Sequence, residues 1–260
     1  MSEYIKVDGH DLYCYEWENE GEAVVLLHGG LSQTAHWAAN IVPDLAGYHV
    51  FAYDRSSHGF TAYREESINF KYQLREAIAY LETVVKEPAH IIGWSDGGII
   101  GLMLAISRPD LVKSLVTIGA NFHYNGTIPQ FEMGPISDED RAEYAIYSPD
   151  SPETLDLIHD HFRVMWKTEP DISLDDLKKI QCPVLVMAGD DDVIQHGHTV
   201  ELFEVLPLGQ LAIIPGTSHI VPKEKPGLVN LIINEFLEDL SYPITKWPIR
   251  RTNPISNQLE

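Results

Sequence analysis

The segment GWSDGG, at residues 93–98, holds the side chains best suited to chemistry. It directly follows the apolar run at residues 89–92, and a buried strand that leads through G-x-S-x-G into an apolar helix is typical of a nucleophile elbow. Gly93 and Gly97 leave room for the strand and the helix to approach each other, which holds the hydroxyl of Ser95 exposed at the carboxyl edge of a sheet. Because a serine hydroxyl is a poor nucleophile at neutral pH, the chain must also supply a base and an acid.

The base and the acid are expected at the ends of later strands, because open parallel sheets bind ligands beyond the carboxyl ends of their strands. One apolar run is followed by the acidic residues 190–192, and the next by a loop that contains His219. The chain order Ser95, Asp192, His219 is the order of nucleophile, acid and base typical of such sheets. His219 would take the proton of Ser95 and return it to the leaving group. Asp192 would orient the imidazole, with Asp190 as the alternative acid.

Two backbone N–H groups are candidates for stabilising negative charge on a reacting oxygen. The N–H of Asp96 is the first in the predicted helix after the nucleophile. The second donor is expected in the loop after the apolar run 23–27, at Gly30, with Leu31 as the alternative. Together they would form an oxyanion hole, in which the loss of one donor typically costs about 3–4 kcal/mol of transition-state stabilisation. His28 is expected to brace this loop rather than to react.

The alternation of strand-like and helix-like segments predicts an α/β fold, with a mostly parallel sheet and helices on both faces. An Asp-Gly turn between the first two alternating runs predicts an antiparallel hairpin at the N-terminal edge. The expected strands are residues 3–7, 12–17, 23–27, 48–53, 89–92, 114–118, 184–188 and 210–214. The expected helices are residues 67–87, with Ser67 as the cap, 97–107, 199–206 and 226–240.

One long segment, residues 121–180, interrupts this alternation without a strand-like run. Helical stretches are expected in it near residues 137–147, 151–166 and 174–180. Because such a length is uncommon for a plain loop, we expect a helical cap inserted over the carboxyl edge of the sheet. The predicted organisation is a core of residues 1–120 and 181–240, a cap of residues 121–180 and a C-terminal tail of residues 241–260.

The predicted substrate pocket combines aromatic side chains with one acidic group. Trp94, Phe122 and Trp166 are candidates to line an apolar pocket for an acyl or alcohol group, beside Leu31. The carboxylate of Asp96 should lie near this pocket, because it follows the nucleophile. It could fix loops by hydrogen bonds, or it could bind a cationic group of the substrate, and the sequence leaves both roles open.

The composition disfavours several classes of partner. The formal net charge of −21, from 18 Lys and Arg against 39 Asp and Glu, argues against nucleic acid and anionic membranes. No run approaches the roughly 20 apolar residues of a membrane span, and the N-terminus lacks a signal pattern, so the cytoplasm is the expected compartment. His196 and His198 have ligand-like spacing but no second cluster, so no metal site is predicted, and serine chemistry requires no cofactor.

These motifs resemble the α/β-hydrolase superfamily, in its cap-bearing branch, over about residues 4–240. The resemblance implies the α/β-hydrolase fold, with the nucleophile at Ser95, the base at His219 and, through the G-x-x-D spacing, the acid at Asp192. GWSDGG is most similar to the valacyclovir hydrolase family, also called biphenyl hydrolase-like proteins. In that family an aspartate after the nucleophile helps to bind the ammonium of amino-acid esters, which implies this role for Asp96.

The turn at residues 54–59 departs from the pattern of the superfamily. It reads DRSSHG instead of D-x-x-G-H-G, which puts Ser57 where the first glycine is usual. We expect local strain there, because only glycine adopts a positive φ cheaply. Arg55 and His58 in this turn are expected to be structural rather than catalytic.

The sequence thus predicts a serine hydrolase that cleaves small carboxylic esters through an acyl-enzyme, with amino-acid esters as a candidate class. An amidase or iminopeptidase, a carbon–carbon bond hydrolase and a perhydrolase could use the same three residues. A small-ligand receptor that retains the fold is the non-enzymatic alternative, and the intact triad argues against it. The expected partner is a small-molecule ester, and the C-terminal tail raises a homodimer as a further expectation.

Overall fold

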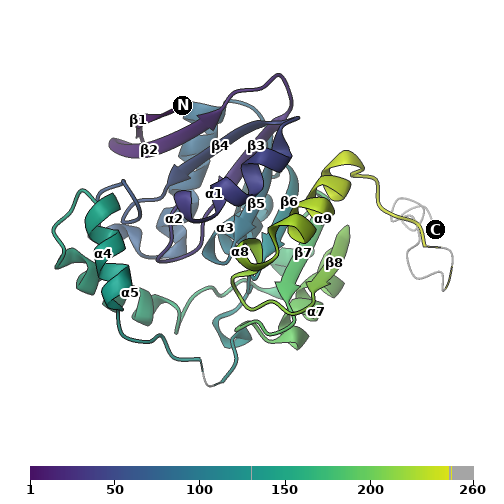
Figure 1. The fold of residues 1–260 in the computed structure, drawn as a ribbon. Coiled ribbons are helices and arrows are strands. Elements are labelled where there is room, and N and C mark those ends of the chain that lie inside the picture. Colours follow the sequence, from purple (N-terminus) through teal and green to yellow (C-terminus); the bar gives the residue numbers. More distant parts are fainter. Residues whose placement is uncertain (130, 246, 248–260) are drawn as a thin grey trace.

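The computed structural model describes residues 1–129, 131–245 and 247, and an eight-stranded sheet forms its centre (Figure 1). The strand order is β1-β2-β4-β3-β5-β6-β7-β8. The β1–β2 and β2–β4 pairs are antiparallel and the other pairs are parallel, which confirms the predicted α/β fold with an N-terminal antiparallel hairpin. The strands are β1 (Ser2–Val7), β2 (His10–Trp17), β3 (Ala23–Leu27), β4 (His49–Asp54), β5 (Ala89–Trp94), β6 (Val112–Ile118), β7 (Val184–Gly189) and β8 (Gly209–Ile214).

The conformation of the turn between β1 and β2 follows from its two residues, Asp8 and Gly9. Asp8 and Gly9 both have positive φ angles, 48° and 85°. A two-residue hairpin loop of type I′ needs positive φ at both positions, because its twist then matches that of the strands. Val7 consequently pairs with His10 across the turn, and the rest of the hairpin follows this register.

Strand β3 shows why its sequence is apolar without interruption. Successive side chains of a strand point to opposite faces of a sheet. Val24 and Leu26 belong to one buried cluster, which includes Trp37, whereas Val25 and Leu27 belong to the cluster on the other face. Helices cover both faces (Figure 1): α1 (Ala35–Ile41) and α9 (Pro226–Glu238) contribute to the first cluster, and α2 (Phe70–Tyr80), α3 (Asp96–Ser107) and α7 (His196–Val205) to the second.

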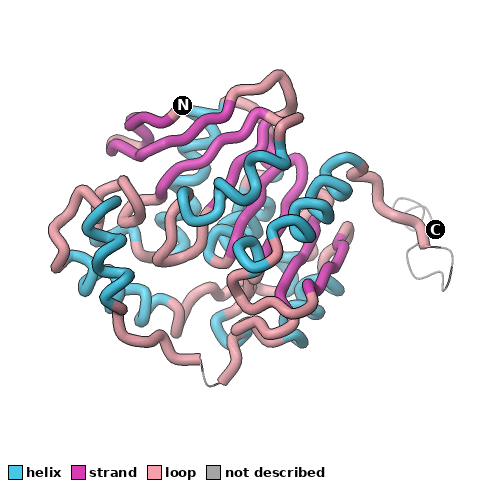
Figure 2. The backbone as a smooth tube through the Cα atoms, viewed as in Figure 1, coloured by secondary structure: helices cyan, strands magenta, loops and turns pink. Residues whose placement is uncertain are grey.

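The segment at residues 121–180 is helical, as expected. It contains α4 (Asp138–Tyr147), α5 (Thr154–Met165) and α6 (Leu174–Leu177), and α4 begins with a capping box at Ser137. Figure 2 shows the pair of helices α4 and α5 connected to the rest of the chain by long loops. The apolar stripe of α5, which includes Ile158 and Phe162, packs into the same cluster as α2 and α3. The exact limits of a cap remain a prediction.

The helix predicted at residues 67–87 is wrong at its start. Ser67 lies in a preceding turn, where its hydroxyl donates to the carbonyl of Arg64, so it cannot cap α2. Asn69 is the cap instead, and its side chain accepts a hydrogen bond from the N–H of Tyr72 at 2.8 Å. The helical run then widens into a π turn after α2. Two short helices, α1 and α8 (Val221–Glu224), were not predicted, because they are too short to show a clear period.

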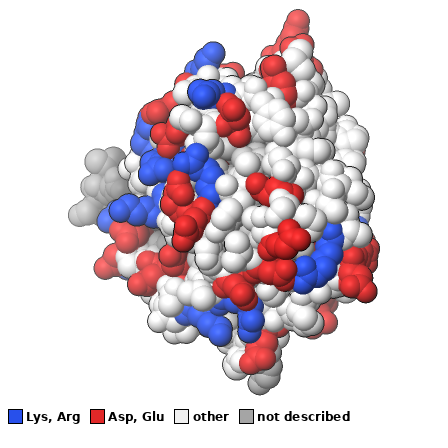
Figure 3. All heavy atoms as spheres, turned by 90° about the vertical axis from the view of Figure 1, so that its left-hand side faces the viewer, with Lys and Arg blue, Asp and Glu red and all other residues white. Residues whose placement is uncertain are grey.

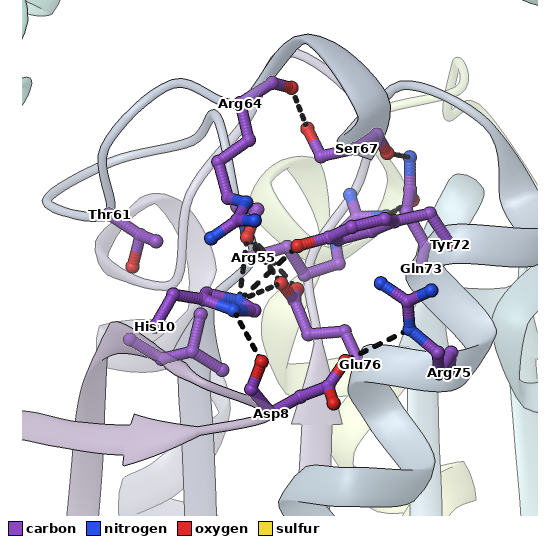
Figure 4. A network of polar contacts seen from close by, with 12 residues as sticks. Asp8, His10, Arg55, Thr61, Arg64, Ser67, Tyr72, Gln73, Arg75 and Glu76 are labelled. Atoms are coloured by element: carbon purple, nitrogen blue, oxygen red, sulfur yellow. Dashed lines mark hydrogen bonds and ion pairs between the residues drawn. The ribbon is translucent and has the colours of Figure 1, made fainter.

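A buried polar network ties the first hairpin, the loop after β4 and α2 together (Figure 4). At its centre Glu76 of α2 is 1% exposed. Its carboxylate accepts from the backbone N–H and the hydroxyl of Ser56 and lies 3.0 Å from Nε2 of His10. Buried charges are tolerated only when they are paired and hydrogen-bonded. This network therefore fixes the loop after β4 against the helix.

The surface carries both signs of charge in spite of the strong negative balance. On the face shown in Figure 3, Lys and Arg side chains are interspersed with Asp and Glu side chains and do not form a separate field. Among the described residues, the helices are too short or too polar to cross a lipid bilayer.

The network around Glu76 makes a prediction about stability. Glu76→Gln removes a charged acceptor from a buried site and should lower the free energy of unfolding by roughly 1–3 kcal/mol. Glu82→Gln is the matched control, because that carboxylate is half exposed and pairs with Arg108 on the surface, where ion pairs contribute about 0–1 kcal/mol. Urea denaturation of both variants measures the difference, and equal effects would contradict the role of the network.

Candidate active site

The segment that carries Ser95 has the geometry of a tight strand-to-helix turn. Ser95 follows β5 and precedes α3, with a φ of 54° and a ψ of −120°. Its neighbours must be glycine: a Cβ at Gly93 would lie 2.3 Å from the carbonyl oxygen of Gly97, and a Cβ at Gly97 would lie 2.0 Å from that of Leu27. The sequence-based interpretation of both glycines as spacers therefore has a steric basis.

Three side chains from three strand ends form a continuous chain of hydrogen bonds. Nε2 of His219 lies 2.9 Å from Oγ of Ser95, and Nδ1 of His219 lies 2.7 Å from Oδ1 of Asp192. Asp192 follows β7 and His219 follows β8, so the parallel strands bring them to the edge where β5 ends. The structure thus brings together the residues predicted as nucleophile, base and acid.

The surroundings of Asp192 favour its ionised form. Burial alone would raise the pKa of this carboxyl, but the hydrogen bonds from His219 and from the backbone N–H of Ile194 outweigh it and lower the pKa. A charged Asp192 can hold the imidazole with its Nε2 free to accept a proton. Asp190, the alternative acid, instead accepts from the backbone N–H of Thr217 at 3.1 Å and supports the loop that carries His219.

The two predicted oxyanion donors, Gly30 and Asp96, both line the pocket that contains Ser95. The preceding carbonyl, of Gly29, accepts from Nη2 of Arg55 and from Nδ1 of His28, each at 2.8 Å. In a trans peptide the C=O and the N–H point to opposite sides. These two bonds therefore fix the N–H of Gly30 on the side opposite to the Arg55 guanidinium.

Arg55 and His28 form a buried support beneath this loop. Burial, and then the charge of Arg55, hold the pKa of His28 well below its usual range, so the imidazole is neutral. Its Nε2 accepts the backbone N–H of Arg55 at 3.0 Å, which leaves Nδ1 to donate to the loop. The guanidinium also donates to Oε1 of Gln73 on α2 (Figure 4). Ser57, two residues further on, has a φ of 70°, as its place in the turn predicted.

The pocket around Ser95 has a volume of about 180 Å³. Of the predicted substrate-binding residues, Trp94, Trp166 and Asp96 line it. Leu31 lines a neighbouring cavity instead. Phe122 is buried against the ring of His198, with the centroids 3.9 Å apart, and is not among the lining residues that the structure describes. The lining residues are Gly29, Gly30, Trp94, Ser95, Asp96, Asn121, Thr127, Phe131, Trp166, Glu169, Val193, Ile194 and His219.

Asp96 connects the elbow to the helical segment. Nε1 of Trp166 donates to both of its carboxylate oxygens, at 3.1 and 3.3 Å. Burial raises the pKa of Asp96 to about 6, although the charge of Arg55 and the bond from Trp166 oppose this. A carboxylate has about four acceptor sites, so one indole N–H leaves acceptor capacity free in the pocket.

Several lining residues were not predicted. Glu169 is the most consequential, because it places a second carboxyl group in the pocket wall. Its Oε2 accepts the N–H of Phe70 at 2.8 Å and so also caps α2. Single residues in loops carry no spacing signal that could have identified them. Among the described residues, no group of three His, Cys, Asp or Glu is placed to hold a metal ion.

The raised pKa of Asp96 predicts a pH dependence of stability. In the unfolded chain this carboxyl loses its proton near pH 4, whereas the folded protein retains it up to about pH 6, so folding becomes less favourable between these values. Asp96→Asn cannot ionise and should gain stability relative to the wild type by about 2 kcal/mol as the pH rises from 4 to 7. Urea denaturation at both pH values tests this, with the exposed Asp110→Asn as the control, which should show no such gain.

Comparison with known proteins gives the family. A model of the Alpha/beta hydrolase family matches residues 24–230. The chain is 23% identical to (E)-2-((N-methylformamido)methylene)succinate hydrolase of Acinetobacter baylyi, over 92% of this chain and 98% of that protein. It is 22% identical to the mouse protein named serine hydrolase BPHL, over 90% of this chain and 85% of that protein.

Solved structures agree on the fold. A serine hydrolase involved in carbazole degradation (the CarC enzyme) superposes with a TM-score of 0.75 at 22% identity, covering 92% of this chain and 98% of that one. A meta-cleavage product hydrolase (CumD) gives a TM-score of 0.73 at 22% identity, over 91% and 97% of the two chains. Since the family model spans most of the chain, this protein belongs to the alpha/beta hydrolase family and is a hydrolase of that superfamily.

Proposed function

We propose that this protein is a serine hydrolase that cleaves small carboxylic esters through an acyl-enzyme at Ser95. The observation that carries the proposal is the hydrogen-bonded chain from Oγ of Ser95 through the His219 imidazole to the Asp192 carboxylate, at 2.9 and 2.7 Å. Nucleophile and base within such distances, with the base held by a third group, are the requirement for activating a hydroxyl. A small-ligand receptor that kept the fold but had no activity would not need Ser95, His219 and Asp192 to be aligned in this way.

The proposed reaction proceeds in two halves. His219 takes the proton of Ser95 as the oxygen attacks the ester carbonyl, and the N–H groups of Gly30 and Asp96 stabilise the oxyanion. The imidazolium then gives its proton to the departing alcohol, which leaves the acyl group on Ser95. A water molecule, activated by the same imidazole, releases the acid. Asp192 remains ionised throughout and stabilises the imidazolium.

The pocket favours esters whose acyl part carries an ammonium group. Its walls combine the carboxyl groups of Asp96 and Glu169 with the rings of Trp94, Trp166 and Phe131. Carboxylates and aromatic faces both attract cations. The similarity of the GWSDGG segment to the valacyclovir hydrolase family supports amino-acid esters as the substrate class.

The nucleophile is tested with p-nitrophenyl butyrate. The wild type should release p-nitrophenol with an initial burst and should react with a fluorophosphonate probe, while Ser95→Ala should lose both, with a fall in rate of at least about a thousandfold. Ser107→Ala, at the exposed end of the same helix, is the control and should retain both. Turnover that persists in Ser95→Ala, or a wild type that binds the ester without cleaving it, would refute the proposal.

Substrate class is tested at Asp96. Near pH 7, where the Asp96 carboxylate and the ammonium of an aminoacyl ester are both largely charged, the carboxylate should favour this ester over its neutral analogue by about tenfold to a hundredfold in kcat/KM, because a charged hydrogen bond contributes roughly 1.5–3 kcal/mol. Asp96→Asn keeps the backbone donor and should abolish the preference while sparing the neutral ester. The exposed Asp110→Asn removes the same charge as a control. Equal losses on both substrates would refute cation recognition, and a screen of amides, carbon–carbon substrates and peroxide would then rank the other chemistries.

A further inference from the structure

A cavity of about 540 Å³ adjoins the pocket around Ser95. The two spaces share three lining residues, Thr127, Phe131 and Trp166. The cavity that Leu31 lines shares none with this pocket among the residues that the structure describes. Because the pocket itself has a volume of only about 180 Å³, an ester larger than the pocket must extend beyond it. The adjoining cavity is the space into which such an ester can extend.

The two spaces differ in the sign of their charged side chains. The catalytic pocket is lined by the acids Asp96 and Glu169, and by no Lys or Arg of the described part of the chain. The adjoining cavity is lined by two cations, Arg163 and Lys167, and by one acid, Glu132. This excess of positive charge runs against the formal net charge of −21 of the whole chain. An anionic group at the active site is therefore attracted to the cavity and not to the catalytic pocket.

The end of α5 positions both cations. Arg163 lies three residues before Trp166 and Lys167 one residue after it, and residues at this helical spacing share one face. The side chain of Arg163 is 52% exposed, and its ion pair with Asp160 spans 3.7 Å, too long for a hydrogen bond. Lys167 is exposed and pairs with no carboxylate of a described residue. Both charges are thus available to a ligand.

The remaining cavity wall suits an apolar or aromatic body. Tyr124, Ile128 and Phe131 contribute rings and aliphatic surface. The amide of Gln195 is already engaged, because its Nε2 donates to the carbonyl of Thr127 at 2.7 Å. A ligand with an aromatic or aliphatic body and one carboxylate matches both the apolar surface and the two cations.

Resting on the proposed function, we propose that the alcohol part of the ester lies in this cavity and that Arg163 and Lys167 select alcohols that carry a carboxylate. The preferred substrate is then an aminoacyl ester of a hydroxy acid, with its ammonium at Asp96 and Glu169 and its carboxylate at the two cations. Arg163 can bind a carboxylate through two parallel hydrogen bonds, whereas Lys167 acts as a point charge. Hydrolysis with one water molecule releases the amino acid and the free hydroxy acid.

Kinetics at pH 7 with two alanine esters test the proposal. The alcohol is 4-(hydroxymethyl)benzoic acid in one ester and 4-(hydroxymethyl)benzamide in the other, which has the same shape without the charge. The wild type should cleave the benzoate ester with a kcat/KM about tenfold higher, because charge-assisted hydrogen bonds are stronger than neutral ones. The alcohol has left before the acyl-enzyme is hydrolysed, so the deacylation rate should be the same for both esters.

Substitutions locate the origin of this preference. Arg163→Gln and Lys167→Gln should each lower it by about threefold and together abolish it, while the benzamide ester is cleaved as before. Arg163→Lys keeps the charge and should retain most of the preference. Lys6→Gln removes the same charge at an exposed position of the edge strand β1 and should behave like the wild type.

The outcomes separate this subsite from the nucleophile. Three results would overturn the subsite while the role of Ser95 stands: equal kcat/KM for the two esters, a preference that the double variant retains, or no cleavage of either ester by a protein that still turns over p-nitrophenyl butyrate. An equal fall on both esters in the variants would also overturn it, because the cations would then only stabilise α5. Absence of turnover with all three substrates would instead refute the proposed function, and the subsite with it.

Discussion

The close approach of β5 and α3 at Ser95 is the constraint on which the rest of the structure depends. A non-glycine residue at a φ of 54° is unfavourable on its own and persists only where its surroundings determine it. The surroundings here are two glycines that admit backbone at 2.0–2.3 Å from a notional Cβ, and a bond from the N–H of Ser95 to the carbonyl of Ile118 at 2.8 Å. Backbone contacts thus fix the position of the Ser95 hydroxyl independently of its contacts with other side chains.

A second layer of support comes from Arg55, a buried cation that forms no ion pair with a carboxylate among the residues the structure describes. Arg55 is fully buried, and its guanidinium donates to the carbonyl oxygen of Gly29 and to Oε1 of Gln73. Burial lowers the pKa of Arg55, while the charge of Asp96 acts in the opposite direction. An arginine used in this way orients a backbone amide and also offsets the negative charge beside the nucleophile. The Glu76 network holds the same turn from the other side.

The sequence predicted those parts of the protein that depend on local pattern. The bounds of β3 follow from burial on both faces, and Ser95, Asp192 and His219 follow from their places after strands. The predicted start of α2 was wrong because Ser67 and Asn69 are both good capping residues. Only the hydrogen bonds of the Ser67 hydroxyl with Ser57 and Arg64, which the sequence does not reveal, exclude Ser67 as the cap. Lining residues such as Glu169 could not be predicted, because they depend on how a long segment folds back over the sheet.

The bond from Trp166 to Asp96 has a consequence for how the helical segment responds to an occupant of the pocket. Any group that engages this carboxylate from the pocket must share it with the indole or displace it. Because this coupling is reciprocal, a ligand that weakens the hydrogen bond from Trp166 to Asp96 is itself bound less tightly while that hydrogen bond is intact. Binding of a ligand next to Ser95 and the contact of the end of α5 with Asp96 are therefore thermodynamically coupled.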